Sequence, residues 1–116
     1  METIFQNTAF VTGALTGLSF MITAFICKRF PPKKINHFIG YRTKQSMESQ
    51  EKWDFAQAYW PKEMLLSSFL LIELSSLFLI LPLEETPAVF SVCMLILMAA
   101  FYPIVMTELA LKSEYT

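Results

Sequence analysis

Two stretches without a single charged side chain constrain the fold of this chain more than any other feature. They run from Thr8 to Cys27 and from Ala88 to Thr107, and each is twenty residues long. With a rise of about 1.5 Å per residue, a helix of that length spans about 30 Å, the thickness of the hydrocarbon core of a bilayer. Both stretches are therefore predicted to be transmembrane helices, at about residues 8–27 and 88–107.

A third apolar stretch, Met64–Leu81, contains one ionisable residue, Glu73. Inserting an acid near the centre of a span costs about 2.5 to 3.5 kcal/mol, whereas each Leu, Ile or Phe there contributes about 0.3 to 0.6 kcal/mol in favour. The stretch holds twelve such apolar residues, so insertion remains favourable. A second span is predicted at about residues 63–81, with Pro61 in the first turn of a new helix.

Composition and charge placement agree with one membrane domain over residues 1–116. Hydrophobic residues make up 54% of the chain and charged residues 16%, which is too apolar for an ordinary soluble domain. Eight of the nine Lys and Arg residues lie in the connecting block 28–62, and none precedes the first span. Because basic residues favour the cytoplasmic side, the N-terminus is predicted outside and the C-terminus inside. The predicted fold is all-α, with three transmembrane helices.

Prolines and polar residues predict further details of the third helix. Thr86 is expected as its N-cap and Pro87 as its first residue, since proline is favoured where no backbone donor is needed. Pro103 lies inside the third stretch. It is expected to kink the helix by freeing the carbonyl of Ala99.

The connecting block contains a polar and aromatic segment, Asn36–Trp60. Gly40 is expected to provide a turn that other residues do not adopt readily. Ser46 to Trp60 is predicted to form a separate amphipathic helix, with Ser46 or Thr43 as its N-cap. Its aromatic side chains favour a position in the headgroup region on the cytoplasmic side, or over the helix bundle.

Small residues recur in the first span. Ala9, Gly13 and Gly17 are spaced by four residues, so they line one helix face and permit close approach of another helix. Two interpretations stay open: packing within the monomer, or a contact face in a homo-oligomer.

Two charged residues are candidates for function. Arg42 carries a forked, permanently charged group suited to a lipid phosphate, a carboxylate or an anionic ligand. Glu73, as an ionisable residue inside a span, is expected either to hydrogen-bond hydroxyl groups on the first helix or to serve a proton-linked or ligand-binding role. Asn36, Thr43 and Ser46 are expected to act as turn and cap residues.

Several function classes are disfavoured by what the sequence contains. The two cysteines have no metal or redox spacing, and His37 is the sole histidine, so no metal and no cofactor are expected. No catalytic residue is assigned, because GxSxG, HExxH and phosphate-binding glycine motifs are not found. An intramembrane hydrolase with Glu51, Glu73 or Glu108 as the base stays open. Nucleic acid is not an expected partner, because acids offset bases in the aromatic segment.

The order of residues in the connecting block resembles the SdpI family, bacterial membrane proteins named for an immunity protein against a secreted, sporulation-delaying peptide toxin. The resemblance rests on Asn36, Ile39, Gly40, Tyr41, Arg42, Thr43, Ser46, Met47, Trp53 and Ala56. The chain is similar to the C-terminal three-span module alone, and Gln57 stands where an Asn is expected. The resemblance implies a multi-pass protein of the bacterial cytoplasmic membrane, protection from an antimicrobial peptide, and binding of a cytosolic regulator.

Three hypotheses of function follow. The first is a non-enzymatic module that gives tolerance to a membrane-active peptide, with Asn36, Arg42, Trp53 and Glu73 as contacts. The second is a homo-oligomeric transporter or ion pathway with Glu73 as a proton-linked site. The third, less favoured, is an intramembrane enzyme. The expected partners are membrane lipids, with a peptide toxin, a cytosolic regulator or a second copy of the chain as further candidates.

Overall fold

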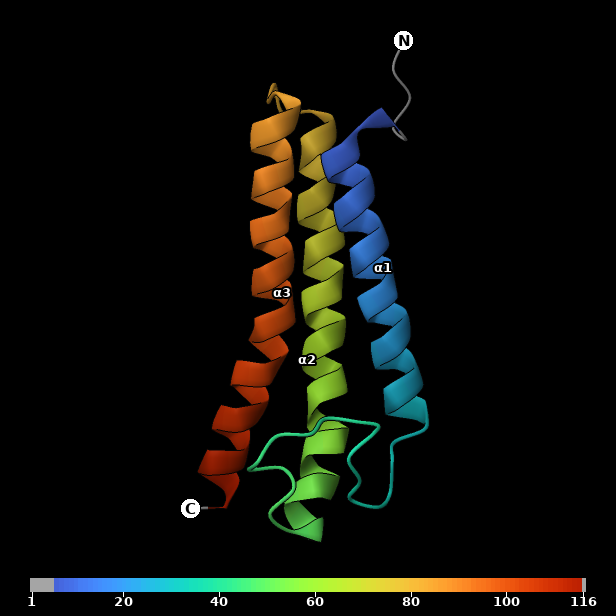
Figure 1. Ribbon diagram of the computed structural model, residues 1–116, viewed down its shortest axis with the longest axis vertical. Helices are drawn as coiled ribbons and strands as arrows, with labels where there is room; N and C mark the ends of the chain where they lie inside the picture. The colour runs from blue at the N-terminus through green and yellow to red at the C-terminus, as the bar shows by residue number, and fades with distance from the viewer. Residues whose placement is uncertain (1–5, 116) are drawn as a thin grey trace.

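The computed structural model of the chain describes residues 6–115. Its three α-helices are α1 (Thr8–Arg29), α2 (Gln50–Ser76) and α3 (Glu85–Glu114), and a short 3₁₀ helix, η2 (Leu77–Leu79), extends α2. Figure 1 shows α2 between α1 and α3 in an elongated bundle, with extents of 55 × 25 × 20 Å. The all-helical fold expected from the sequence is confirmed.

Two of the helices, α1 and α3, are long and apolar enough to cross a membrane. The second helix does not meet the same description. Its apolar part begins only after Lys62 and Glu63, includes Glu73, and ends as an α-helix at Ser76. By length and composition the two apolar helices indicate a membrane protein, while a third crossing by α2 and η2 stays a prediction.

The expected break at Pro61 is wrong. The predicted separate helix Ser46–Trp60 and the second apolar stretch form one continuous helix, α2, with Pro61 inside it. The helix begins after Ser49, whose hydroxyl accepts a hydrogen bond from the backbone N–H of Lys52 at 3.1 Å. A proline inside a helix removes one backbone hydrogen bond. Here Pro61 is fully buried beside Trp60, so tertiary packing outweighs that local loss.

The ends of the three helices opposite the connecting block are joined by polar side chains. Asn7 caps α1 by accepting a hydrogen bond from the N–H of Phe10 at 3.0 Å, and its amide donates to the carbonyl of Phe78 at 2.7 Å. The hydroxyl of Thr8 donates to Glu85 Oε1 at 2.9 Å. These contacts bring the start of α1 against the end of α2 and the start of α3.

The third helix begins two residues earlier than predicted, because Glu84 and not Thr86 is its N-cap. Pro87 therefore lies within the first turn, where its missing N–H is not required. Further along, the Ser67 hydroxyl of α2 donates to the carbonyl of Ala99 at 2.5 Å. This is the carbonyl that Pro103 leaves without a helical partner, and Figure 1 shows that α3 changes direction in its C-terminal part.

Apolar residues form two buried clusters, one toward each end of the bundle. The cluster near the start of α1 contains Ala9, Phe78, Ala88 and Val92. The cluster near the connecting block contains Tyr41, Ala56, Trp60 and Leu111. Between them the helices meet through small buried residues, which lets backbones approach closely in a lipid environment. These are Gly13, Gly17, Ala24, Ser67, Ser68, Ser75 and Ala99.

Gly13 and Gly17 bring α1 against the other helices. A Cβ atom added to Gly13 would lie 1.8 Å from the hydroxyl oxygen of Ser75 and 2.8 Å from a methyl carbon of Val92. A Cβ atom added to Gly17 would lie 2.6 Å from Cγ1 of Ile72. The small-residue face of α1 is thus occupied by α2 and α3 of the same chain.

Gly13→Ala is predicted to lower the free energy of unfolding by about 1 to 3 kcal/mol, because the added methyl group overlaps Ser75. At an open helix position the same change would stabilise by about 0.8 to 1 kcal/mol. Thermal unfolding in detergent measures the difference, and Leu15→Ala, on the exposed side of α1, is the control. Adding Ser75→Gly should recover part of the loss. A Gly13→Ala variant as stable as the parent would contradict the close approach.

Candidate functional site

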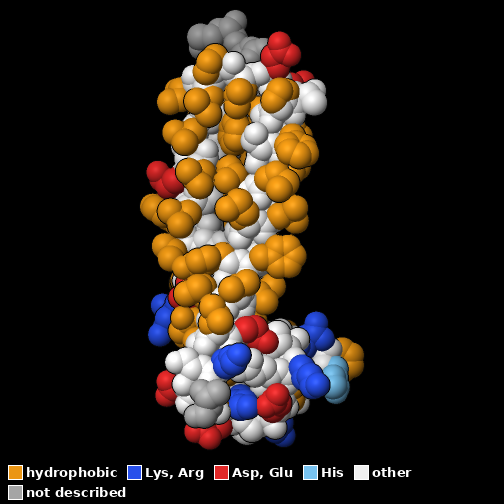
Figure 2. All heavy atoms as spheres, turned by 90° about the vertical axis from the view of Figure 1, so that its left-hand side faces the viewer, with side chains coloured by type: hydrophobic (Ala, Val, Ile, Leu, Met, Phe, Trp, Pro, Cys, Tyr) orange, Lys and Arg blue, Asp and Glu red, His pale blue; other side chains and the backbone are white. Residues whose placement is uncertain are grey.

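The connecting block folds over one end of the bundle and packs on the first turns of α2 and the last turns of α3 (Figure 1). We call residues 30–60 and 104–115 together the polar cap. Figure 2 shows charged side chains gathered at this end, whereas hydrophobic side chains cover the shaft of the bundle. The motif residues that carry the family resemblance lie in the polar cap, so its internal contacts define the candidate site.

A side-chain amide holds the main chain at the centre of the polar cap. Gln57 is 2% exposed; its Oε1 accepts from the N–H of Tyr41 at 2.9 Å, and its Nε2 donates to the carbonyl of Tyr41 at 2.7 Å. The preceding Gly40 has φ of +99°, and a Cβ atom there would lie 2.6 Å from Cγ of Pro32. Glycine is required for both its backbone angle and its size.

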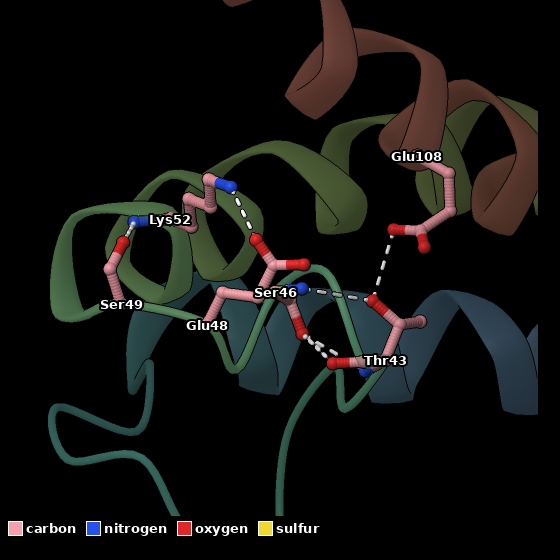
Figure 3. Close-up of polar contacts among 6 residues, drawn as sticks. All are labelled: Thr43, Ser46, Glu48, Ser49, Lys52 and Glu108. Atoms are coloured by element: carbon pink, nitrogen blue, oxygen red, sulfur yellow. Dashed lines mark hydrogen bonds and ion pairs between the residues drawn. The ribbon is translucent and has the colours of Figure 1, made fainter. Parts of the chain in front are cut away.

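The side chain of Tyr41 connects the loop to α3. Its hydroxyl lies 3.0 Å from Glu108 Oε2 and 3.1 Å from the carbonyl of Ile104, either of which can accept its proton. The hydroxyl of Thr43 donates to the same Glu108 oxygen at 3.0 Å (Figure 3). Burial, followed by the hydrogen bond and negative charge of Glu108, raises the pKa of Tyr41. The tyrosine is therefore held as a neutral donor.

Thr43 and Ser46 close a tight turn before α2. The N–H of Thr43 donates to the hydroxyl oxygen of Ser46 at 2.9 Å, and the N–H of Ser46 donates to that of Thr43 at 3.1 Å (Figure 3). These two reciprocal hydrogen bonds close the turn. The N-cap of α2 is Ser49, not Thr43 or Ser46 as the sequence predicted. Next to the turn, the ion pair between Lys52 and Glu48, at 2.6 Å, lowers the pKa of Glu48.

Trp53 and Gln50 anchor the beginning of the loop to α2. The indole N–H of the fully buried Trp53 donates to the carbonyl of Pro32 at 2.8 Å. The amide of Gln50 donates to the carbonyl of Lys33 at 2.6 Å. Trp53 therefore performs an internal structural role, because its one polar atom is used within the chain.

Asn36 and Arg42 shape the exposed part of the loop. Asn36 Oδ1 accepts hydrogen bonds from the N–H groups of Phe38 at 2.9 Å and Ile39 at 2.7 Å. Arg42 donates to the carbonyl of His37. The side chain of Arg42 is exposed and also lines a cavity of about 250 Å³ whose apolar walls include Trp60.

The candidate residues do not meet at one point. Tyr41, Thr43 and Ser46 lie together, but Glu73 lies 13 residues beyond Trp60 on α2, which is about 20 Å along the helix axis. Glu73 is exposed on the surface of the bundle, whereas the hydroxyl groups of Thr16, Ser19 and Thr23 on α1 donate to carbonyls of their own helix. Tyr41, Thr43, Ser46, Gln57 and Glu108 form a hydrogen-bonded centre within the polar cap. The structure thus separates this centre from Glu73, an acid on the apolar shaft.

Glu51 and Glu108, two candidate bases of an intramembrane hydrolase, lie in different environments. Glu51 is exposed at the start of α2, whereas Glu108 is engaged by two hydroxyl groups. Among residues 6–115, no group of three His, Cys, Asp or Glu side chains is arranged to hold a metal ion.

Two residues of the hydrogen-bonded centre were not singled out as site residues from the sequence. Gln57 was visible only as a departure from the family pattern, and Glu108 only as a candidate base. Their signal was weak because both act through partners distant in the sequence.

Gln57→Leu is predicted to lower the free energy of unfolding by about 1 to 3 kcal/mol, because it leaves the buried N–H of Tyr41 unpaired and the Tyr41 carbonyl with the Ser46 hydroxyl as its remaining donor. Thermal unfolding in detergent measures this loss. Gln50→Leu, which removes an exposed amide, is the matched control and should cost much less. Equal losses in the two variants would contradict the central role of Gln57.

The raised pKa of Tyr41 predicts a loss of stability at alkaline pH. Below its ordinary pKa of 10.0, both the folded and the unfolded chain keep the phenol proton, and the contribution is complete. Above that pH the unfolded chain releases its proton first, so stability falls. Thermal unfolding from about pH 8 to about pH 11 should show a shallower decline for Tyr41→Phe than for the parent. Parallel declines would refute this assignment.

Comparison with known proteins places these features in a family. A family model described as the SdpI/YfhL protein family matches residues 33–107. The chain is similar to the uncharacterized protein YfhL of Bacillus subtilis (strain 168), with 39% identity over 61 residues, which is 53% of this chain and 56% of that protein. The match thus spans a little over half the length of this curated relative. No solved structure matches the chain significantly.

Proposed function

The chain belongs to the SdpI/YfhL protein family, and from this membership we propose that it confers tolerance to a membrane-active antimicrobial peptide. It does so as a small multi-pass protein of the bacterial cytoplasmic membrane. It crosses the membrane three times, with the N-terminus outside and the polar cap in the cytoplasm. The two long apolar helices and the eight basic residues of block 28–62 support this orientation.

One observation carries the proposal: Glu73 is exposed on the apolar shaft of the bundle. Its neighbours on α2 include the exposed apolar residues Phe69, Leu74 and Leu77. An acid at the centre of a span costs about 2.5 to 3.5 kcal/mol when it faces lipid. A basic side chain of a membrane-active peptide would offset this cost by pairing with Glu73. The peptide contact is therefore proposed at Glu73, with Arg42 as a second contact at the polar cap.

The other two contacts expected from the sequence have internal partners. Asn36 holds two backbone N–H groups of the loop, and Trp53 donates to Pro32. Substituting Asn36 or Trp53 would therefore change peptide binding only by changing the shape of the polar cap. Glu73 and Arg42 have exposed side chains, although Arg42 also donates to the carbonyl of His37. Glu73 is therefore the first residue to test for direct contact, and Arg42 the second.

A cytosolic regulator would bind the polar cap at an open depression of about 470 Å³. This depression lies between the loop, the start of α2 and the end of α3. Lys44 and Lys52 line it together with Glu48 and Glu108. The mixture of charges suits a polar protein surface better than an apolar ligand.

The alternative is a homo-oligomeric transporter or ion pathway with a proton-linked Glu73. The same exposure of Glu73 favours it, because a second copy would also remove the acid from lipid. Gly13 and Gly17 are packed against the chain's own α2 and α3, so the subunit contact would use the Glu73 face of α2.

In cells lacking the protein, the parent gene should restore survival against a panel of cationic membrane-active peptides. Glu73→Gln should lower the peptide concentration that the cells survive by about tenfold, the factor expected for about 1.4 kcal/mol of lost binding. Glu114→Gln, an exposed acid outside the apolar shaft, is the control. Membrane content of each variant is measured by immunoblot.

Unchanged survival in the deletion strain would refute the tolerance function. The transport alternative would instead be supported by proton flux in proteoliposomes that Glu73→Gln removes.

A further inference from the structure

An apolar tip projects from the polar cap. Phe38 is 88% exposed and Ile39 is 66% exposed, although both lie outside the apolar shaft where lipid would cover such side chains. We call His37, Phe38 and Ile39 the loop tip. Large apolar side chains at this exposure in a charged region indicate a surface that contacts something apolar.

Hydrogen bonds within the chain lower the cost of moving the backbone of the loop tip out of water. The N–H groups of Phe38 and Ile39 both donate to Asn36 Oδ1, at 2.9 and 2.7 Å. The carbonyl of His37 accepts a hydrogen bond from Arg42. An unpaired backbone group opposes transfer out of water, and here three such groups already have partners within the chain.

The loop tip is also held at both ends. On one side Trp53 donates to the carbonyl of Pro32. On the other side Gln57 holds the N–H and the carbonyl of Tyr41. The loop is therefore presented in one shape, which reduces the entropy lost when it binds.

The charge around the loop tip selects its partner. Between Lys28 and Lys44 the chain has six basic residues and no acidic residue. Such a segment beside a membrane span is attracted to anionic lipid headgroups. A basic segment with apolar side chains at its tip has the composition of an interfacial anchor.

The position of the loop tip fits the membrane interface. Residues 30–36 connect it to the end of α1, whose last turn contains Lys28 and Arg29. In Figure 2 the histidine colour appears beside a hydrophobic side chain and basic side chains, projecting sideways from the polar end of the molecule next to the hydrophobic shaft. A bilayer around the shaft would bring its headgroup layer close to this projection.

We propose that Phe38 and Ile39 insert into the adjacent leaflet, between anionic phospholipid headgroups that contact Arg42 and the neighbouring lysines. Asn36 and Arg42 are positioning residues in this arrangement, because they pair the backbone of the tip. The inference does not depend on the peptide tolerance proposed above. It assigns the exposed face of the motif to lipid.

The test places an indole at the tip. The full chain carrying Phe38→Trp is incorporated into nanodiscs of phosphatidylcholine with phosphatidylglycerol, and fluorescence is corrected for Trp53 and Trp60 with the parent protein. Glu51→Trp, at an exposed position in the first turn of α2, is the control. The added indole at position 38 should emit at shorter wavelength, be quenched strongly by lipids brominated near the headgroup, and resist aqueous iodide.

Two further arms separate the roles of charge and backbone pairing. Quenching of the tip indole by brominated lipid should weaken in nanodiscs of phosphatidylcholine alone, and equal quenching in both lipids would overturn the headgroup contact. Asn36→Ala added to Phe38→Trp should reduce lipid quenching, and no reduction would overturn its positioning role.

If iodide quenches the tip indole as strongly as the control indole, while brominated lipid does not, the tip faces water and insertion is refuted. The surface would then be one for a cytosolic protein. A failed survival test with an inserted tip would refute only the tolerance function, so the two failures are distinguishable.

Discussion

The amide of Gln57 paired with both backbone groups of Tyr41 is the interaction on which the polar cap depends. It holds the loop at the point where Gly40 turns the chain back toward the bundle. From there the side chain of Tyr41 reaches Glu108 on α3 and its ring stacks on Trp60 of α2, with 6.5 Å between centroids. One buried amide thus places a loop against two helices, and a buried polar network of this kind specifies a geometry only when its members are satisfied.

The bundle itself follows a different rule, because apolar surface gains little by moving from lipid to another helix. Small residues supply the contact in the middle of the shaft, where Gly13 and Gly17 let α1 approach α2. Where Pro103 frees the carbonyl of Ala99, the hydroxyl of Ser67 completes its hydrogen bond. The large side chains that this leaves outside form the hydrophobic surface of the shaft in Figure 2.

These two regions divide the motif into residues that hold the fold and residues that remain exposed. Trp53, Ser46 and Tyr41 are buried and use their polar atoms within the chain. Glu73 and the loop tip face outward, on the shaft and at the polar cap respectively. The interaction surfaces that we propose therefore lie outside the hydrogen-bonded centre. The centre supports them by fixing the shape of the polar cap.

The sequence alone determined the helical class, the positions of the apolar helices, the small-residue face and the family, because these depend on runs, spacing and order along the chain. It predicted the bounds of α1 to within two residues, whereas only the tertiary structure decided that α2 continues through Pro61. Local propensity disfavours that continuation, and burial overrides it. Gln57 and Glu108 likewise acquired their roles only in the folded chain, since they bind partners 16 and 67 residues away. Such pairings depend on which side chains meet across the bundle, and no local pattern encodes them.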